Sequence, residues 1–161
     1  MKYNLAGRVE FLTAIPLRTT PTPYSNSEFY PDNQTILTQN ISVCDLVDKY
    51  GIGEVWINMY HTSKTVPIES NLSMGTNIRK LWIQNGYGDI SNSFLENDLP
   101  QCQNTYTVYN YNYSRAFIQK DFTETIVHNH IHQIERYLKL AFSSNNTTDL
   151  TYDSFTRNGE R

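Results

Sequence analysis

Three of the four histidines in this chain lie in one short segment, "TIVHNHIHQIERYL", together with a glutamate. At about 100° per residue, a helix places His128, His132 and Glu135 on one face. Two imidazoles at i and i+4, with Cβ atoms about 6 Å apart, can bind one Zn²⁺ or another divalent ion. Glu135, one turn later, can be a third ligand or can orient an imidazole. The spacing therefore predicts a metal site made of His128, His132 and Glu135.

The pattern is close to the H-E-x-x-H helix of zinc proteases, but it differs at the residue that would be the general base. Asn129 stands where those enzymes have glutamate, and an amide cannot accept a proton from water. A protease of that type is disfavoured, so a metal here would use another base or none. His130 points away from His128 and His132, toward the core side of the helix, and we expect a hydrogen-bonded histidine there rather than a ligand.

A purely structural interpretation of the same residues stays open. His128 and His132 would then be partly buried residues bonded to their neighbours, and Glu135 would pair with Lys139 at i+4.

Other candidate site residues lie at the ends of predicted strands. His61 follows a predicted strand, and Glu69 lies in the next loop, "VPIES". The carboxyl ends of parallel strands are where α/β proteins place their sites, so both residues are expected to approach the long helix. Arg115 follows a tyrosine-rich strand and could hold a carboxylate or another anion, or form a salt bridge with Glu124.

The first half of the chain predicts a strand, a loop, a helix and a second strand. "RVEFLTAI", residues 8–15, is apolar on both faces and predicts a buried strand, whereas the proline-rich residues 16–35 predict a long loop. "SVCDLVDKYG" predicts a helix that is capped by Ser42 and ended by Gly51, and "GEVWINMY" predicts the next strand. Strand, helix and strand together predict a right-handed parallel βαβ unit.

The second half predicts a strand and a long helix. "TYTVYNYNY", residues 105–113, alternates and predicts a strand with one apolar and one hydrated face. A helix is expected from about residue 121 to 142, with Asn129 and Arg136 facing solvent. Its expected buried side chains recur at spacings of four and three: Val127, Ile131, Ile134, Leu138 and Ala141.

These elements predict the α/β class, with a short, mainly parallel sheet and flanking helices. Residues 1–142 are expected to form a single domain with long loops, and residues 143–161 a mobile or truncated tail.

Composition excludes some partners and leaves others open. Charged residues are 18% of the chain and the net charge is −3, so nothing favours nucleic acid. No apolar run approaches the roughly 18 residues that span a membrane. No signal peptide is evident, and the two cysteines, Cys44 and Cys102, could form one bridge or none.

Glycosylation motifs favour an extracellular, secreted glycoprotein. Chance would supply about half of the N-x-[ST] sites in a chain so rich in Asn, Ser and Thr. The candidates are Asn33, Asn40, Asn71, Asn112, Asn145 and Asn146.

The segments "GEVWINMYHTSKTVPIESNLS", "TYTVYNYNYSR" and "VHNHIHQIE" resemble a family of uncharacterised, secreted proteins of microbes and lower eukaryotes. That family has an E-V-W-I strand, a Glu-Ser pair, a Y-N-Y-x-R segment and an H-x-H-x-x-E helix. The resemblance covers roughly residues 50–140 and carries no established activity. It implies that Glu69, Arg115 and the histidine helix, His130 included, belong where a site would be sought. It also implies that such chains continue past residue 161, where a further ligand would lie.

Two functions of different classes follow. The first is a metal-dependent hydrolase, in which metal-activated water attacks an ester, an amide or a glycan-linked group. The second is a non-catalytic extracellular module for adhesion, glycan binding or self-assembly, because exposed tyrosines and low charge do not resist association.

Overall fold

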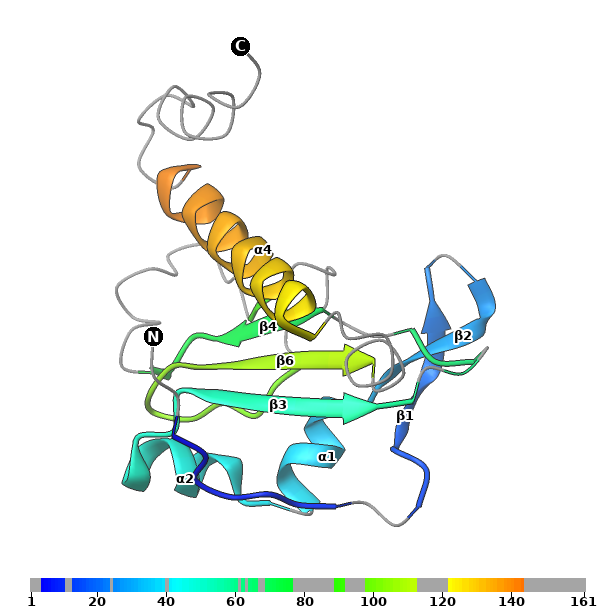
Figure 1. Cartoon of the computed structure of the whole chain (residues 1–161), viewed down its shortest axis with the longest axis horizontal. Coiled ribbons are helices and arrows are strands. Elements are labelled where there is room, and N and C mark those ends of the chain that lie inside the picture. Colours follow the sequence, from blue (N-terminus) through cyan, green and yellow to red (C-terminus); the bar gives the residue numbers. More distant parts are fainter. Residues whose placement is uncertain are drawn as a thin grey trace.

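The chain forms an α/β domain in which a four-stranded sheet lies between helices (Figure 1). The computed structural model describes residues 4–10, 13–23, 25–39, 41–60, 62, 64–66, 69–76, 89–91, 98–112 and 122–143. Helices α1 and α2 lie on one face of the sheet and α4 on the other, and a hairpin of β1 and β2 lies to one side. The helices are α1 (Asn33–Gln39), α2 (Val43–Tyr50) and α4 (Phe122–Ser143). The strands are β1 (Leu17–Thr22), β2 (Ser25–Pro31), β3 (Glu54–Met59), β4 (Ser70–Ser73), β5 (Ile90–Ser91) and β6 (Tyr106–Asn112).

The four-stranded sheet is mixed, so the prediction of a mainly parallel sheet is wrong. Its strand order is β3-β6-β4-β5. Among its described strands, only β3 and β6 run parallel to each other, with Glu54 opposite Thr107 and Met59 opposite Asn112. Strand β4 is antiparallel to both β6 and β5.

The predicted βαβ unit is also wrong, because its first strand is missing. Residues 8–10 are exposed and form no strand, and Val9 is 52% exposed. Residues 11 and 12 lie outside the described part of the chain. Strand β3 takes its parallel partner from β6, far along the sequence. Hydrophobic alternation indicates local extension, but it does not show which strand will be the neighbour.

The predicted long loop is instead a hairpin followed by a helix. Strands β1 and β2 pair antiparallel, with Leu17 opposite Pro31 and Pro21 opposite Phe29. Proline is tolerated in edge strands, and β1 is paired with β2 alone among the described strands. On its other edge, β2 is bridged through Phe29, whose N–H donates to the Lys64 carbonyl at 2.8 Å and whose carbonyl accepts from Val66 N–H at 3.0 Å. Helix α1 begins directly afterwards, where Asp32 accepts hydrogen bonds from the backbone N–H (3.0 Å) and the hydroxyl (2.7 Å) of Thr35.

Helix α2 and strand β3 are confirmed. The predicted cap by Ser42 is wrong: its side chain makes no hydrogen bond to the backbone of the helix and donates instead to the Asp45 carboxylate at 2.9 Å. Hydrogen bonds to Lys49 and then to Ser42 lower the pKa of the exposed Asp45 carboxyl. Gly51 ends the helix in the left-handed conformation, with φ of 69°, which glycine adopts without strain.

Strand β6 forms as predicted, but both of its faces are buried rather than one. Thr107 and Asn110 are 8% and 3% exposed, and Val108 and Tyr111 are fully buried. The strand is central in the sheet, and helices cover it on both sides (Figure 1). The core between β3, β6, α1 and α2 contains Ile36, Leu37, Val43, Val47, Ile57, Met59, Leu99, Cys102, Tyr106 and Val108.

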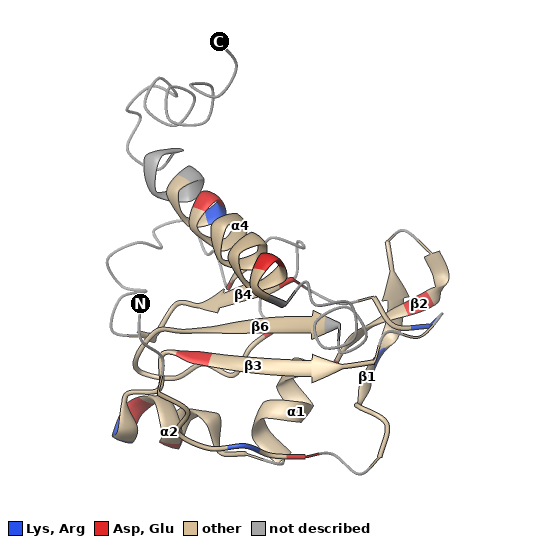
Figure 2. Cartoon of the chain, viewed as in Figure 1, with Lys and Arg blue, Asp and Glu red and all other residues tan. Residues whose placement is uncertain are grey.

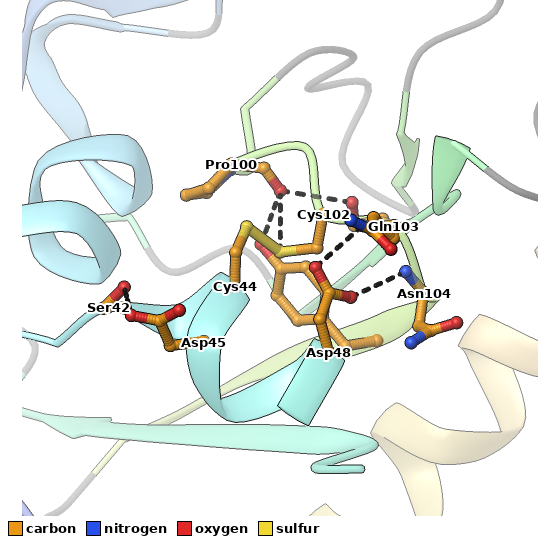
Figure 3. Close-up of a disulfide and its surroundings, with 10 residues drawn as sticks. Ser42, Cys44, Asp45, Asp48, Pro100, Cys102, Gln103 and Asn104 are labelled. Atoms are coloured by element: carbon orange, nitrogen blue, oxygen red, sulfur yellow. Dashed lines mark hydrogen bonds between the residues drawn. A yellow bond between two sulfur atoms is a disulfide. The ribbon is translucent and has the colours of Figure 1, made fainter. Parts of the chain in front are cut away.

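Cys44 and Cys102 form a disulfide that ties α2 to the segment before β6 (Figure 3). Beside it, the Asp48 carboxylate accepts the backbone N–H groups of Gln103 and Asn104, at 3.1 and 2.9 Å. Burial raises the pKa of Tyr106, whose hydroxyl donates to the Pro100 carbonyl at 2.9 Å. Helix α2 is therefore attached to this segment by a covalent bond and by two hydrogen bonds.

Candidate metal centre

Helix α4 has the predicted length, but its orientation on the sheet is the reverse of the predicted one. Val127, Ile131 and Ile134 are 50%, 49% and 56% exposed, whereas Asn129 and Gln133 are 3% and 4% exposed. The polar residues Asn129 and Gln133 therefore face the sheet, and three of the five residues expected in the core face outward. Leu138 is half-buried, and the side chain of Ala141 lies outside the described part.

The reason is that the sheet presents backbone carbonyls to this helix. Asn129 Nδ2 donates to the carbonyls of Glu69 and Asn110, each at 3.2 Å, and Gln133 Nε2 donates to that of Ile90 at 3.0 Å. Glu69 and Asn110 lie at the end of the β4–β6 ladder, where the Asn110 N–H also donates to Glu69 O at 3.1 Å. A buried carbonyl without a donor is costly, so side-chain amides are favoured over apolar groups on this face.

This orientation brings Glu69, His128 and His132 together. Each offers one ligand atom, and these three atoms lie within 4.8 Å of one another. His128 Nε2 is 3.6 Å from Glu69 Oε1, and the two imidazole rings have centroids 4.3 Å apart. Two ligand atoms about 2.0–2.1 Å from a tetrahedral ion lie about 3.3 Å apart. The group thus needs only a small contraction to hold an ion.

Glu135 lies beside this group and contacts one of its members. Glu135 Oε2 is 3.2 Å from His132 Nδ1. Because a carboxylate only accepts, Nδ1 carries the proton and the lone pair of Nε2 is left for a ligand role. This carboxylate–imidazole arrangement orients many metal-binding histidines. Among the described residues, Glu69 rather than Glu135 thus belongs to the group of three nearby ligand atoms, and Glu135 contacts His132 from outside that group.

The geometry suits an ion with open coordination positions. The side chains of His128 and Glu69 are 54% and 43% exposed, so water can reach the site. If these three residues held an ion, they would leave a coordination position open to water, as in catalytic zinc sites.

His130 is held in a different place. Its Nδ1 donates to the Ile126 carbonyl at 2.7 Å, and its ring stacks on Tyr109 with centroids 4.0 Å apart. Its Nε2 lies 3.4 Å from Glu54 Oε2. His130 thus anchors α4 to β3 and β6 and is not part of the Glu69 group.

The remaining candidates divide into described and undescribed residues. His61 and Arg115 lie outside the described residues, as do Asn40, Asn145, Asn146 and the side chain of Asn112. Asn33 and Asn71 are fully buried, and Asn33 donates to Asp98 Oδ2 at 2.6 Å. These two positions have no room for a glycan in the folded chain, which corrects their glycosylation assignment.

Sequence reasoning missed the roles of Asn129 and Gln133. The only signal was a pair of amides at i and i+4, opposite the apolar residues of the helix. Such a pair is usually a solvated face. Whether such a pair faces solvent or the sheet depends on the backbone carbonyls that the sheet offers as acceptors.

Comparisons with protein-family models, curated proteins and solved structures find no match to this chain. None of the helices in the described part is long and apolar enough to cross a membrane. The disulfide is compatible with an extracellular protein, because such bonds persist in oxidising compartments. In Figure 2 the charged residues are scattered over the described elements.

Proposed function

We propose that this protein binds a divalent metal ion, Zn²⁺ in the first instance, through Glu69, His128 and His132. The observation that carries the proposal is the convergence of three ligand atoms, two from α4 and one from the residue before β4, within 4.8 Å. Two imidazoles and a carboxylate are a donor set that Zn²⁺ prefers and that some zinc hydrolases use.

Metal-activated water is the chemistry that this site would supply. An ion with an open position lowers the pKa of bound water and makes hydroxide available near neutral pH. We propose hydrolysis of an ester, an amide or a glycan-linked group in an extracellular setting. His132 would bind through Nε2 while Glu135 holds Nδ1, and Asn129 would keep the Glu69 backbone beside His128.

Calorimetric titration of the chelator-treated protein with Zn²⁺ tests the metal proposal. We expect one ion per chain, and loss of that binding in His128→Ala/His132→Ala and in Glu69→Gln. Glu124→Gln is the matched control, because Glu124 is an exposed carboxylate on the first turn of the same helix. Undiminished binding in the double variant would overturn the proposal.

The hydrolase part needs a separate measurement. Wild-type protein loaded with Zn²⁺ should cleave an activated aryl ester faster than the chelator-treated protein, and His128→Ala/His132→Ala should not respond to Zn²⁺. If the protein binds Zn²⁺ but gives equal rates in both states, the metal site stands and the hydrolase does not. The outward apolar residues of α4 favour the second candidate function, an extracellular assembly module.

A further inference from the structure

The outward face of α4 is apolar from Val127 to Leu138, which is unusual for a helix on the surface of a domain. Val127, Ile131 and Ile134 are each about half exposed, and Leu138 continues the row. We call Val127, Ile131, Ile134 and Leu138 the outer row. Contiguous apolar side chains on a surface mark interaction sites more often than scattered ones do.

The spacing of the outer row indicates what kind of surface covers it. Successive members are separated by four, three and four residues, and the sequence continues the alternation at Ala141. This is the a/d repeat of a coiled coil, in which each side chain inserts between four residues of a facing helix. The partner that fits is therefore an α-helix.

We propose that the partner is α4 of a second copy of this chain, packed antiparallel. One flank of the outer row is occupied within the domain, because the His130 side chain is 17% exposed and stacks on Tyr109. The other flank is open, with the side chains of His128 and Glu135 54% and 39% exposed. Only the open flank can contact a second helix.

Antiparallel packing makes that flank self-complementary. When two such helices pack antiparallel, the same flank of each helix lies against its counterpart. When they pack parallel, one flank of the first helix lies against the opposite flank of the second. If Ile131 packs opposite Ile134 of the second copy, His128 lies opposite Glu135 of that copy. The interface is then isologous and closes as a two-fold dimer.

The shape and charge of the domain agree with this arrangement. The C-terminal part of α4 extends beyond the sheet (Figure 1), so a second helix can lie along it. A net charge of −3 adds little repulsion between copies. About two heptads bury less than the roughly 800 Å² per partner of a standard interface, so we expect a dimer that dissociates on dilution.

Sedimentation velocity over about a hundredfold range of concentration tests the proposal, with chelator present so that metal plays no part. Wild-type protein should shift from monomer to dimer as its concentration rises. Ile131→Lys/Ile134→Lys and Ile131→Glu/Ile134→Glu should each weaken dimerisation by about tenfold or more, because like charges would face each other. These side chains are about half exposed, so circular dichroism should show both variants folded.

Mixing the two variants provides the decisive measurement. The lysine and glutamate variants together should form a heterodimer, because opposite charges then meet across the antiparallel pair. Val9→Lys, at an exposed apolar residue outside α4, should dimerise like wild type. A monomeric wild type at every concentration, or variants that do not form a heterodimer when mixed, would overturn the proposal.

Discussion

At the scale of single residues, the distances between side-chain atoms separate the candidate ligands of the site from the residues that only contact a ligand. Glu69 and His128 come from different elements, and their closest atoms are 3.6 Å apart. Glu135 is one turn from His132 on the same helix and touches only Nδ1 of that ring among the site's described contacts. The two carboxylates therefore have different roles, which their exposure alone does not reveal.

Glu135→Gln tests the orienting role. A glutamine oxygen can still accept from His132 Nδ1, but without the charge that raises the basicity of the ring. We expect Zn²⁺ affinity to fall by about tenfold, whereas Glu69→Gln should remove the site. Competition with a chromophoric chelator measures both. Equal losses in the two variants would mean that Glu135 is itself a ligand.

At the scale of secondary structure, local signals predicted several elements but not their partners. Helix α2 was predictable from Gly51, which ends it, although the predicted side-chain cap by Ser42 does not form. Strand β3 was predictable from its alternation. The pairing of β3 with β6 was not, because it joins residues about fifty positions apart through backbone groups that every residue has. The hairpin was missed because its prolines resemble loop residues unless the strands are known to be edges.

The orientation of α4 could not be predicted from hydrophobic periodicity either. The pattern correctly placed His128, His132 and Glu135 near one another but assigned Asn129 to solvent. Asn129 and Gln133 face the sheet because they donate to the carbonyls of Glu69, Asn110 and Ile90. These carbonyls are far apart in the sequence and lie under the helix only after the sheet has formed. Glu69 was a candidate from its position in the sequence, and the reversed orientation places it beside His128.

Asn129→Ala tests this account of the helix. The variant loses donors to the buried carbonyl of Asn110 and to the partly buried carbonyl of Glu69, so the free energy of unfolding should fall by about 1–3 kcal/mol. Zn²⁺ affinity should fall as well, because α4, which carries His128, is then no longer hydrogen-bonded to the Glu69 backbone. Urea denaturation and metal titration measure the two effects.

Gln133→Ala is the matched control. Gln133 contacts the carbonyl of Ile90 and makes no described contact with Glu69, so its loss should lower stability and leave metal affinity unchanged. A drop in Zn²⁺ affinity of the same size in both variants would show that the affinity depends on how firmly α4 packs on the sheet and not on the hydrogen bond from Asn129 to Glu69.

At the scale of the whole molecule, the two faces of the sheet are held by different chemistry. On one face, α1 and α2 pack through apolar side chains and a disulfide. On the other face, α4 is attached through amides and an imidazole. The first face should therefore resist denaturant better, while the second should respond to metal.

Cys44→Ala/Cys102→Ala should substantially lower the free energy of unfolding. The bond joins residues separated by 58 positions, and the chain-entropy relation for a loop of that size gives about 4 kcal/mol. Guanidinium denaturation of the variant and of the oxidised wild type measures the difference. A difference below about 1 kcal/mol would mean that the apolar contacts and Asp48 hold α2 without help from the bond.

Strand β6 occupies the middle of the sheet, yet it comes late in the chain. Strands β3 and β4 follow each other in sequence but do not pair, since each is joined to β6. While the chain is being synthesised, the edges of β3 and β4 that pair with β6 stay unpaired until residues 106–112 have left the ribosome. Cys44 must likewise wait for Cys102. The order of synthesis thus exposes these strand edges to aggregation, and Cys44 to early oxidation, until residue 112 has been made.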